Sequence, residues 1–156
     1  MEPLALSQQA LDRLKAEYEE RTTARRKEIT LRIEEARAHG DLSENAEYDA
    51  AKNDQGHNEA RVRQLEDMIK RAVVVEASGD SGEVAPGCLV ELRYEGDDDT
   101  TTYLYGSIEE RHPTYEVLST SSPLGVALAG KKPGDRVTYQ GPKRELAVEL
   151  VGVRAP

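Results

Sequence analysis

Two long stretches with helical spacing, joined by a short acidic segment that follows Gly40, constrain the fold of this chain most strongly. The first stretch begins at Ser7, a residue favoured at helix N-caps. It ends at His39-Gly40, where Gly40 suits a left-handed C-cap. One stripe runs along it at roughly helical spacing: Leu11, Leu14, Tyr18, Arg25, Ile29, Ile33 and Ala36. We therefore predict one helix from residue 7 to residue 39.

The second stretch places its inward-facing residues in steps of three and four, which is typical of a coiled-coil seam. This seam consists of Tyr48, Ala51, Gln55, Asn58, Val62, Leu65 and Ile69. It is apolar near its base and becomes polar at Gln55 and Asn58. A connection as short as residues 40–44 forces two helices to run antiparallel. The pattern predicts a helical hairpin with its tip at residues 40–49.

The composition changes sharply near residue 77. Before it, Glu, Ala, Arg, Lys and Leu dominate, and these residues favour helices. After it, Gly, Pro, Thr, Val and Tyr become common, which is typical of strands and turns. We predict an α+β protein with a coiled-coil hairpin at 1–76, a linker at 77–87 and a small α+β domain at 88–156. The apolar residues 72–76 would leave the hairpin and dock on this second domain.

The second domain is expected to be a small sheet with one short helix. Strands are predicted at 88–94, 100–107, 115–119, 136–140 and 146–153, with a solvated hairpin turn at 97–99. Ser122-Pro123 suits the N-cap and first position of a helix that runs through Ala129 and is closed by Gly130. Cys88 is expected to be a small buried hydrophobe.

Charge and cysteine content exclude several functional classes. The formal net charge of −9, from 21 basic and 30 acidic residues, is unlike that of a simple nucleic-acid binder, which is expected to be basic. A lone cysteine forms no internal disulfide and suits a reducing cytosol. No apolar segment reaches the roughly 20 residues that span a bilayer. Since Trp and Phe are absent, a large aromatic pocket for a small ligand is not expected.

Four carboxylates lie within nine residues at the tip: Asp41, Glu44, Glu47 and Asp49. Grouped carboxylates on a rigid tip suit one task well, which is to hold a divalent cation and a water molecule against a phosphodiester.

A purely structural interpretation competes with this one. Asp41 at an N-cap with Glu44 three residues later is close to a capping box, and acidic residues complement the helix dipole. This interpretation accounts less well for Glu47 and Asp49, which follow the capping positions. It does not account at all for Ser43 and Asn45. A cap would also make the tip rigid, so the two interpretations are compatible.

Most basic residues of the two helices are expected to form a solvated face with i,i+4 ion pairs. Lys52 is the exception, because it lies near the tip, where a phosphate would bind. The histidines at 39, 57 and 112 lack metal-ligand spacing. No glycine-rich phosphate loop, Cys-x-x-Cys pair or nucleophilic triad is visible.

The block from Gly40 to Lys52, followed by Gln55-Gly56, resembles the tip motif of bacterial transcript-cleavage factors of the GreA branch. Residues 59–66 are similar to the second helix of that family, and residues 122–135 to its C-terminal segment. The resemblance covers nearly the whole chain in order and spacing. This chain departs from the family by an N-terminal segment without the usual glycine and by an extra tip carboxylate, Asp49.

The resemblance implies a mechanism. An FKBP-like C-terminal domain would dock on bacterial RNA polymerase at the rim of the secondary channel, and the hairpin would enter that channel. Tip carboxylates that match Asp41 and Glu44 would help to hold the second Mg²⁺ of the polymerase and orient the attacking water. The polymerase would then cut backtracked nascent RNA near its 3′ end. The chain itself would be no enzyme, would carry no cofactor of its own, and is expected to be a cytoplasmic monomer.

The resemblance also assigns supporting roles. The residues expected to support the tip are Ser43, Asn45, Glu47, Tyr48 and Lys52. Those expected to contact RNA are Arg37, Lys52 and Arg61. Those expected to dock on the polymerase are Ser122, Pro123, Leu124 and Gly125.

Three other functions remain open at this point. A related channel binder with a very acidic tip would inhibit the polymerase by sequestering its metal. The spacing of Asp41 and Glu44 favours cleavage instead. A prolyl isomerase is suggested only by the FKBP-like fold, and the absence of Trp and Phe argues against it. A plain coiled-coil adaptor would depend on the seam residues Leu65 and Ile69, whatever the charge of the tip.

Overall fold

The computed structural model describes residues 2–41, 44–76 and 82–156. The chain divides into two compact units. One unit is Asp12–Arg71, and the other combines Met1–Leu11 with Ala72–Pro156. The first eleven residues thus belong to the unit that holds the C-terminal sheet. Residues 77–81 of the predicted linker lie outside the described residues.

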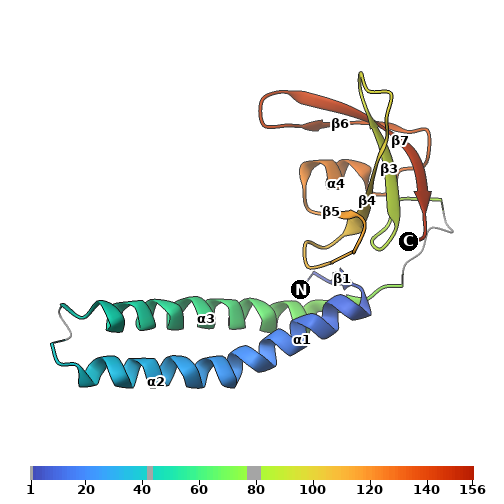
Figure 1. The fold of residues 1–156 in the computed structure, drawn as a ribbon. Helices are drawn as coiled ribbons and strands as arrows, with labels where there is room; N and C mark the ends of the chain where they lie inside the picture. The colour runs from blue at the N-terminus through green and yellow to red at the C-terminus, as the bar shows by residue number, and fades with distance from the viewer. Residues whose placement is uncertain (1, 42–43, 77–81) are drawn as a thin grey trace. The chain divides into compact units, whose positions relative to one another are not determined.

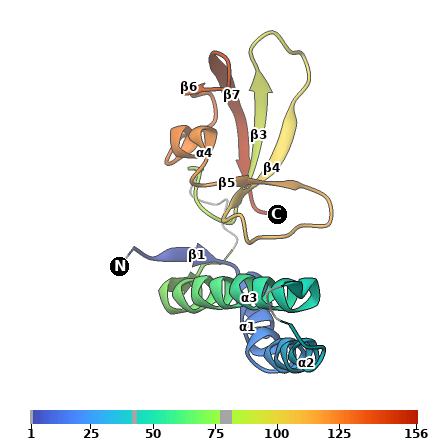
Figure 2. The same cartoon turned by 90° about the vertical axis from the view of Figure 1, so that its left-hand side faces the viewer.

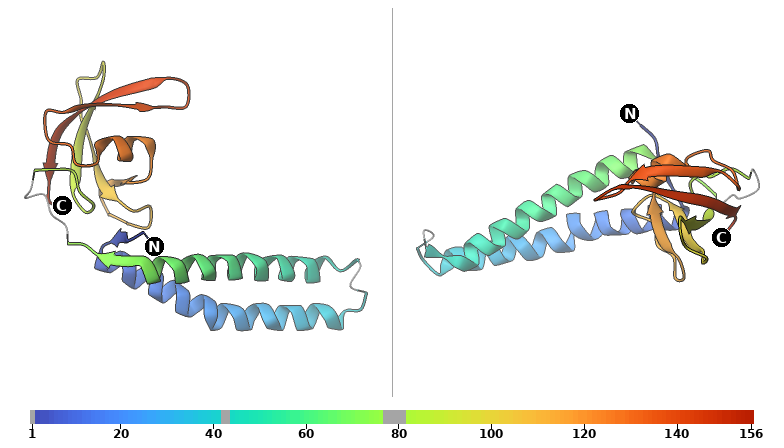
Figure 3. Two further views of the ribbon diagram at one scale, coloured as in Figure 1. Left: turned by 180° about the vertical axis from the view of Figure 1, so that it is seen from behind. Right: turned by 90° about the horizontal axis from the view of Figure 1, so that it is seen from above.

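The hairpin is built from three helices: α1 (Gln8–Thr22), α2 (Ala24–Ala38) and α3 (Ala46–Arg71). Figures 1 and 3 show α2 and α3 side by side and antiparallel. The helix predicted as continuous from 7 to 39 is therefore wrong in one respect, since it is interrupted at Thr23. The backbone of Thr23 leaves the helical region, with φ −117° and ψ −88°.

Two adjacent threonines account for this interruption. The Thr22 hydroxyl donates to the carbonyl of Tyr18 at 2.8 Å, and the Thr23 hydroxyl donates to the carbonyl of Glu19 at 2.6 Å. Such bonds from threonine to a preceding carbonyl compete with the helical ladder and often bend the helix. The stripe of spaced residues continues across the break, so periodicity alone did not indicate it.

The helix ends follow the predicted chemistry. The hydroxyl of Ser7 accepts a hydrogen bond from the backbone N–H of Ala10 at 3.1 Å, which confirms Ser7 as a cap. At the other end, α2 closes through His39, and Gly40 follows it with φ +108°. This confirms Gly40 as the residue that leaves the helix in a left-handed conformation.

The seam of the hairpin is buried largely as predicted. On α2 the buried residues are Ile29, Ile33 and Ala36, and on α3 they are Ala51, Asn58, Val62, Leu65 and Met68. Met68 takes the buried place expected for Ile69, which is half-buried. A helix of 3.6 residues per turn drifts against a repeat of 3.5, so a stripe shifts by one residue over several turns.

The other unit contains a five-stranded sheet in the order β5-β4-β3-β7-β6 (Figure 2). Strands β4 and β5 pair in parallel, and the other neighbours are antiparallel. The strands are β3 (Leu89–Tyr94), β4 (Thr101–Gly106), β5 (Glu116–Ser119), β6 (Arg136–Gln140) and β7 (Glu145–Arg154). Each strand lies within one residue of its predicted bounds. The short helix α4 (Pro123–Leu128) is also present.

A two-stranded parallel pair was not predicted. Strand β1 (Leu4–Leu6) pairs with β2 (Ala72–Val74), so the chain before α1 lies beside the chain after α3. Leu6 is fully buried. Strands of three residues are too short to show an alternating pattern, and only the pairing identifies them.

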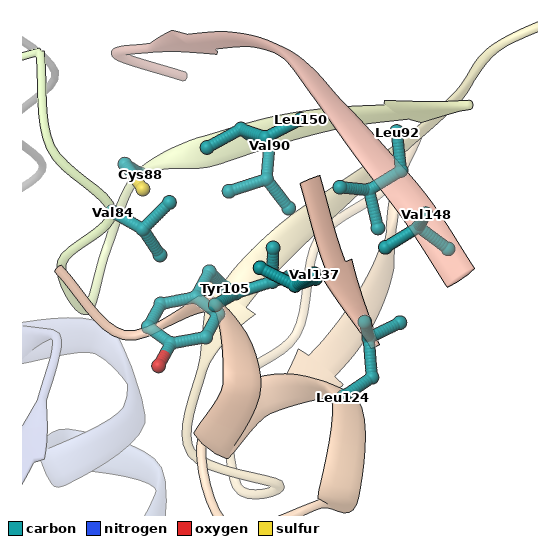
Figure 4. Packing of buried hydrophobic residues seen from close by; sticks show 10 residues of the cluster. Val84, Cys88, Val90, Leu92, Tyr105, Leu124, Val137, Val148 and Leu150 are labelled. Atoms are coloured by element: carbon teal, nitrogen blue, oxygen red, sulfur yellow. The ribbon is translucent and has the colours of Figure 1, made fainter. Parts of the chain in front are cut away.

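The core of the sheet unit lies between the sheet and α4 (Figure 4). Leu124 and Leu128 of α4 join buried residues of the strands, and the hydroxyl of Tyr105 donates to the carbonyl of Gly125 at 2.8 Å. Cys88 is fully buried, as predicted, and burial raises the pKa of its thiol. In the described parts of the chain, no helix combines the length and the hydrophobicity that a transmembrane span requires.

Candidate functional site

The tip of the hairpin is organised by Asn45. Its side-chain oxygen accepts a hydrogen bond from the backbone N–H of Tyr48 at 3.1 Å, and its carbonyl accepts one from Asp49. Asn45 is therefore the N-cap of α3. The competing interpretation, in which Asp41 and Glu44 form the capping box of this helix, is wrong, since α3 begins at Ala46, after both residues.

Three contacts connect the end of α2 to the start of α3 across the tip. The Asn45 amide donates to the carbonyl of Ala36 at 2.6 Å. The Nδ1 atom of His39 lies 3.0 Å from a carboxylate oxygen of Glu47. The guanidinium of Arg37 lies 5.9 Å from the ring centroid of Tyr48, within cation–π range.

These contacts bear on the residues that were expected to support the tip. Asn45, Glu47 and Tyr48 each reach the opposite arm. Lys52 instead donates to Gln55 on its own helix at 2.8 Å. Ser43 lies outside the described residues. His39 was not expected to support the tip. The sequence feature that indicates this role is its position beside Gly40, opposite the first turn of α3.

Asp41 and Glu44 are both exposed, in the connection that the three contacts fix on either side. Asp49 is exposed in the first turn of α3. The positive end of the helix dipole favours such an acidic first turn. Within residues 2–41, 44–76 and 82–156, no group of three or more His, Cys, Asp or Glu residues could hold a metal ion by itself.

The basic residues expected to contact RNA are not gathered in one place. Arg37 and Lys52 lie near the tip, but Arg61 lies nine positions beyond Lys52 on α3, which is about 13 Å along the helix axis. Arg61 donates to both carboxylate oxygens of Glu17, at 2.9 Å each. The bonds from Arg61, together with that from Arg21, lower the pKa of Glu17 to about 2. An RNA contact by Arg61 stays a prediction.

The segment expected to dock on a partner forms the start of α4. Ser122 caps the helix by accepting from the backbone N–H of Gly125 at 3.0 Å. Pro123 is exposed, whereas Leu124 and Gly125 are buried. The next residue, Val126, has 64% of its surface exposed. The sequence resemblance did not name Val126. An exposed apolar side chain next to the expected docking residues is the feature that identifies it.

Comparison with known families matches both halves of the chain. The family model described as "Transcription elongation factor, N-terminal" matches residues 4–74. The model described as "Transcription elongation factor, GreA/GreB, C-term" matches residues 79–155. The two matches are consecutive and together span nearly all of the sequence.

Individual relatives agree with the family models. The chain is 39% identical over 150 residues to transcription elongation factor GreA of Bacillus cytotoxicus, covering 96% of this chain and 95% of that protein. It is 44% identical over 143 residues to transcription elongation factor GreA of Streptomyces avermitilis, covering 91% and 87%. Among solved structures, GreA factor homolog 1 of Thermus thermophilus is 29% identical, with 97% of this chain and 98% of that chain covered and a TM-score of 0.44.

The matches to the family models and to the curated relatives show that the chain is of the transcription elongation factor class. The chain belongs to the GreA/GreB family.

Proposed function

We propose that this chain binds bacterial RNA polymerase, inserts its hairpin into the secondary channel and stimulates cleavage of backtracked nascent RNA near the 3′ end. The chemistry belongs to the polymerase, and the chain acts as a non-catalytic cofactor in the cytoplasm. Membership of the elongation-factor family supports this proposal. So does the α+β fold, in which a slender hairpin carries carboxylates at its tip.

The observation that carries the proposal is the exposure of Asp41 and Glu44 at a tip whose helix is capped by another residue. Capping of α3 would have accounted for both carboxylates, and Asn45 performs that role instead. Both carboxylates are exposed at the tip, where a partner would meet them.

The oxygen atoms of these two carboxylates are ligands that Mg²⁺ prefers. Mg²⁺ demands near-octahedral coordination, so two carboxylates need further ligands, which the polymerase and water would supply. Asp41 and Glu44 would help to hold a second Mg²⁺ of the polymerase, which would supply activation of a bound water and stabilisation of the charge on the phosphate. In this proposal Asp41 and Glu44 contribute ligands and accept a hydrogen bond from the attacking water, and Asn45 keeps them in position.

The remaining roles follow from exposure. Arg37 and Lys52 are exposed near the tip and would contact the phosphates of the displaced RNA. The start of α4, with Pro123 and Val126 exposed, would form part of the surface that docks on the polymerase. The chain would do this as a monomer.

The test uses a halted, backtracked elongation complex with RNA labelled at its 3′ end. We expect the wild-type chain with Mg²⁺ to release short 3′ fragments, and the chain alone to release none from free RNA. Asp41→Asn and Glu44→Gln should each abolish release while they still compete with the wild-type chain for the polymerase. Asp98→Asn, in the exposed turn between β3 and β4, is the matched control and should act as wild type.

Other outcomes identify the competing functions. Slower nucleotide addition without fragment release would mean an inhibitory channel binder. Full release by both tip variants would show that these carboxylates are not the site. No effect of any variant on the polymerase would leave a coiled-coil adaptor.

A further inference from the structure

A layer of polar side chains crosses the seam of the hairpin halfway between its base and its tip. At its centre is Asn58, with 2% of its surface exposed. In the described part of the unit Asp12–Arg71, Asn58 is the sole polar side chain buried to this degree. We call Asn58, Arg21, Glu17 and Arg61 the Asn58 layer.

The contacts of this layer connect α1 to α3. The Asn58 amide donates to the carbonyl of Arg21 at 3.1 Å, and the Arg21 guanidinium donates to the Asn58 side-chain oxygen at 3.1 Å. Arg21 also donates to Glu17 at 2.7 Å, and Glu17 accepts the two bonds from Arg61. The side-chain oxygen and nitrogen of Asn58 are thus both hydrogen-bonded across the seam.

The layer coincides with the interruption of the first arm. Arg21 lies in the last turn of α1, just before Thr23. The last four carbonyls of a helix lack partners within that helix and need another donor. Asn58 supplies this donor to Arg21 from the opposite arm, so the end of α1 is fixed by a side chain of α3.

Apolar packing on the tip side of the layer is sparse. Along the first arm no apolar residue is buried between Leu14 and Ile29. The cluster beyond the layer consists of Ile29, Ile33 and Ala51, with Tyr48 packed against it. A cavity of about 300 Å³ lies beside the layer, lined by Arg26, Ile29, Thr30, Gln55, Asn58 and Glu59. Hydrophobic contacts alone therefore constrain this part of the hairpin weakly.

We propose that Asn58 is a positioning residue, which fixes the angle between α1 and α2 and so determines where the tip carboxylates lie relative to the base of the hairpin. A polar residue at a single seam position is known to specify register at a cost in stability. Here Asn58 would specify the direction of α2 relative to α1. This inference rests on the proposed function for its consequence in cleavage, but the angle itself is a property of the free chain.

The length of the arm amplifies any error in this angle. The 15 residues of α2 span about 22 Å, so a change of about 5° at Thr23 would move the tip by about 2 Å. Misplacement of a catalytic group by about 1 Å can lower a rate by about 100-fold. A loose junction would therefore reduce cleavage without reducing the amount of folded protein.

The first experiment measures the angle in the free chain. Spin labels at Lys15 on α1 and Glu34 on α2, both exposed, report the distance across the junction. We expect a narrow distance distribution in the wild type and a broader or displaced one in Asn58→Leu. An unchanged distribution in Asn58→Leu would overturn the proposal.

The second experiment separates positioning from stability. Asn58→Leu gains apolar contact in the seam but leaves the carbonyl of Arg21 without this donor, so we expect the two effects largely to offset and the midpoint of thermal unfolding to change little. Its maximal cleavage rate should fall about tenfold or more. The concentration for half-maximal stimulation should not change. Val62→Ala is the control, since it lowers stability by opening a cavity but leaves the layer intact.

Two results would count against the inference. Equal maximal rates for Asn58→Leu and wild type would overturn it, as would a loss of rate in Val62→Ala as large as that in Asn58→Leu. If the wild type itself stimulates no cleavage, the proposed function fails. The spin-label distances would then still decide whether Asn58 fixes the junction.

Discussion

The side-chain amide of Asn45 donates to the backbone carbonyl of Ala36 at 2.6 Å, and so joins the last turn of α2 to the residue that caps α3. One side chain thereby gives a second donor to a carbonyl at the end of one helix, which also accepts from the backbone N–H of His39, and satisfies an N–H at the start of the next. The carboxylates of Asp41 and Glu44 lie in the segment between these two fixed points, so Asn45 restricts where they can be.

Replacing Asn45 by alanine removes both hydrogen bonds at once. We expect Asn45→Ala to lower the free energy of unfolding by about 1–2 kcal/mol, because it deletes a helix cap and removes one of the two donors to the carbonyl of Ala36. Thermal unfolding followed by far-UV circular dichroism measures this. Asn53→Ala, exposed on the same helix, is the matched control and should change little. Equal stability of the two variants would contradict the role assigned to Asn45.

The ion pairs of Glu17 predict a dependence of stability on pH. Its pKa is lowered from 4.5 to about 2, chiefly by the bonds from Arg61. A lowered folded-state pKa means that the ionised carboxylate stabilises the fold fully above pH 4.5. This stabilisation decreases as the pH falls toward 2. Because the pair is partly exposed, we expect only about 1 kcal/mol.

Denaturant unfolding of wild type and Glu17→Gln at several pH values tests this. The wild type should be the more stable of the two at neutral pH, and the difference should vanish near pH 2. Glu20→Gln, an exposed carboxylate on the same helix, controls for the loss of one charge. A difference between wild type and Glu17→Gln that does not change with pH would show that the ion pairs do not stabilise the hairpin.

The sequence predicted the helical arms and the strands well because each is long enough to show its period. The bounds of β6 are those predicted, at Arg136–Gln140. The interruption at Thr23 was missed, since it depends on hydroxyl bonds to Tyr18 and Glu19 that leave the apolar stripe unchanged. The β1–β2 pair was missed because it joins residues 4–6 to residues 72–74, and short strands reveal themselves only through their partners.

At the tip, the motif indicated the right segment but assigned capping to the wrong residue. Asp, Ser and Asn are similarly favoured at N-caps. The sequence offered Asp41, Ser43 and Asn45 within five positions, and propensity alone cannot choose among them. The choice is made by the backbone of the turn, which places Asn45 where its side chain reaches both Tyr48 and Ala36.

Gly56 lies in the interior of α3, and a Cβ added there would meet no atom within 4 Å. Glycine in a helix interior is destabilising relative to alanine, because it loses more conformational freedom on folding. We expect Gly56→Ala to raise the free energy of unfolding of the hairpin by roughly 0.5–1 kcal/mol. Denaturant unfolding followed by circular dichroism measures the change. A decrease in stability would mean that the helix needs glycine at this position.

Gly125 presents the opposite case. A Cβ added to it would lie 1.9 Å from the carbonyl oxygen of Ser119, and a backbone atom cannot move aside as a flexible side chain could. We expect Gly125→Ala to displace α4 and to destabilise the sheet unit by about 3 kcal/mol. Hydrogen exchange of the strand amides would show this loss. Unchanged exchange would mean that α4 adjusts without cost.

The close approach of Ser119 to Gly125 determines which variant can test the start of α4 as a docking surface. A loss of polymerase binding in Gly125→Ala would report a damaged fold and not a lost contact.

Val126 is the informative position, because most of its side chain is exposed. We expect Val126→Ser to keep the unfolding midpoint of the wild type and to weaken polymerase binding about 3- to 10-fold, since an exposed apolar side chain buried on binding contributes about 1 kcal/mol. Binding to the polymerase measured by fluorescence anisotropy gives the comparison. Full affinity of Val126→Ser would place the docking surface elsewhere on the sheet unit.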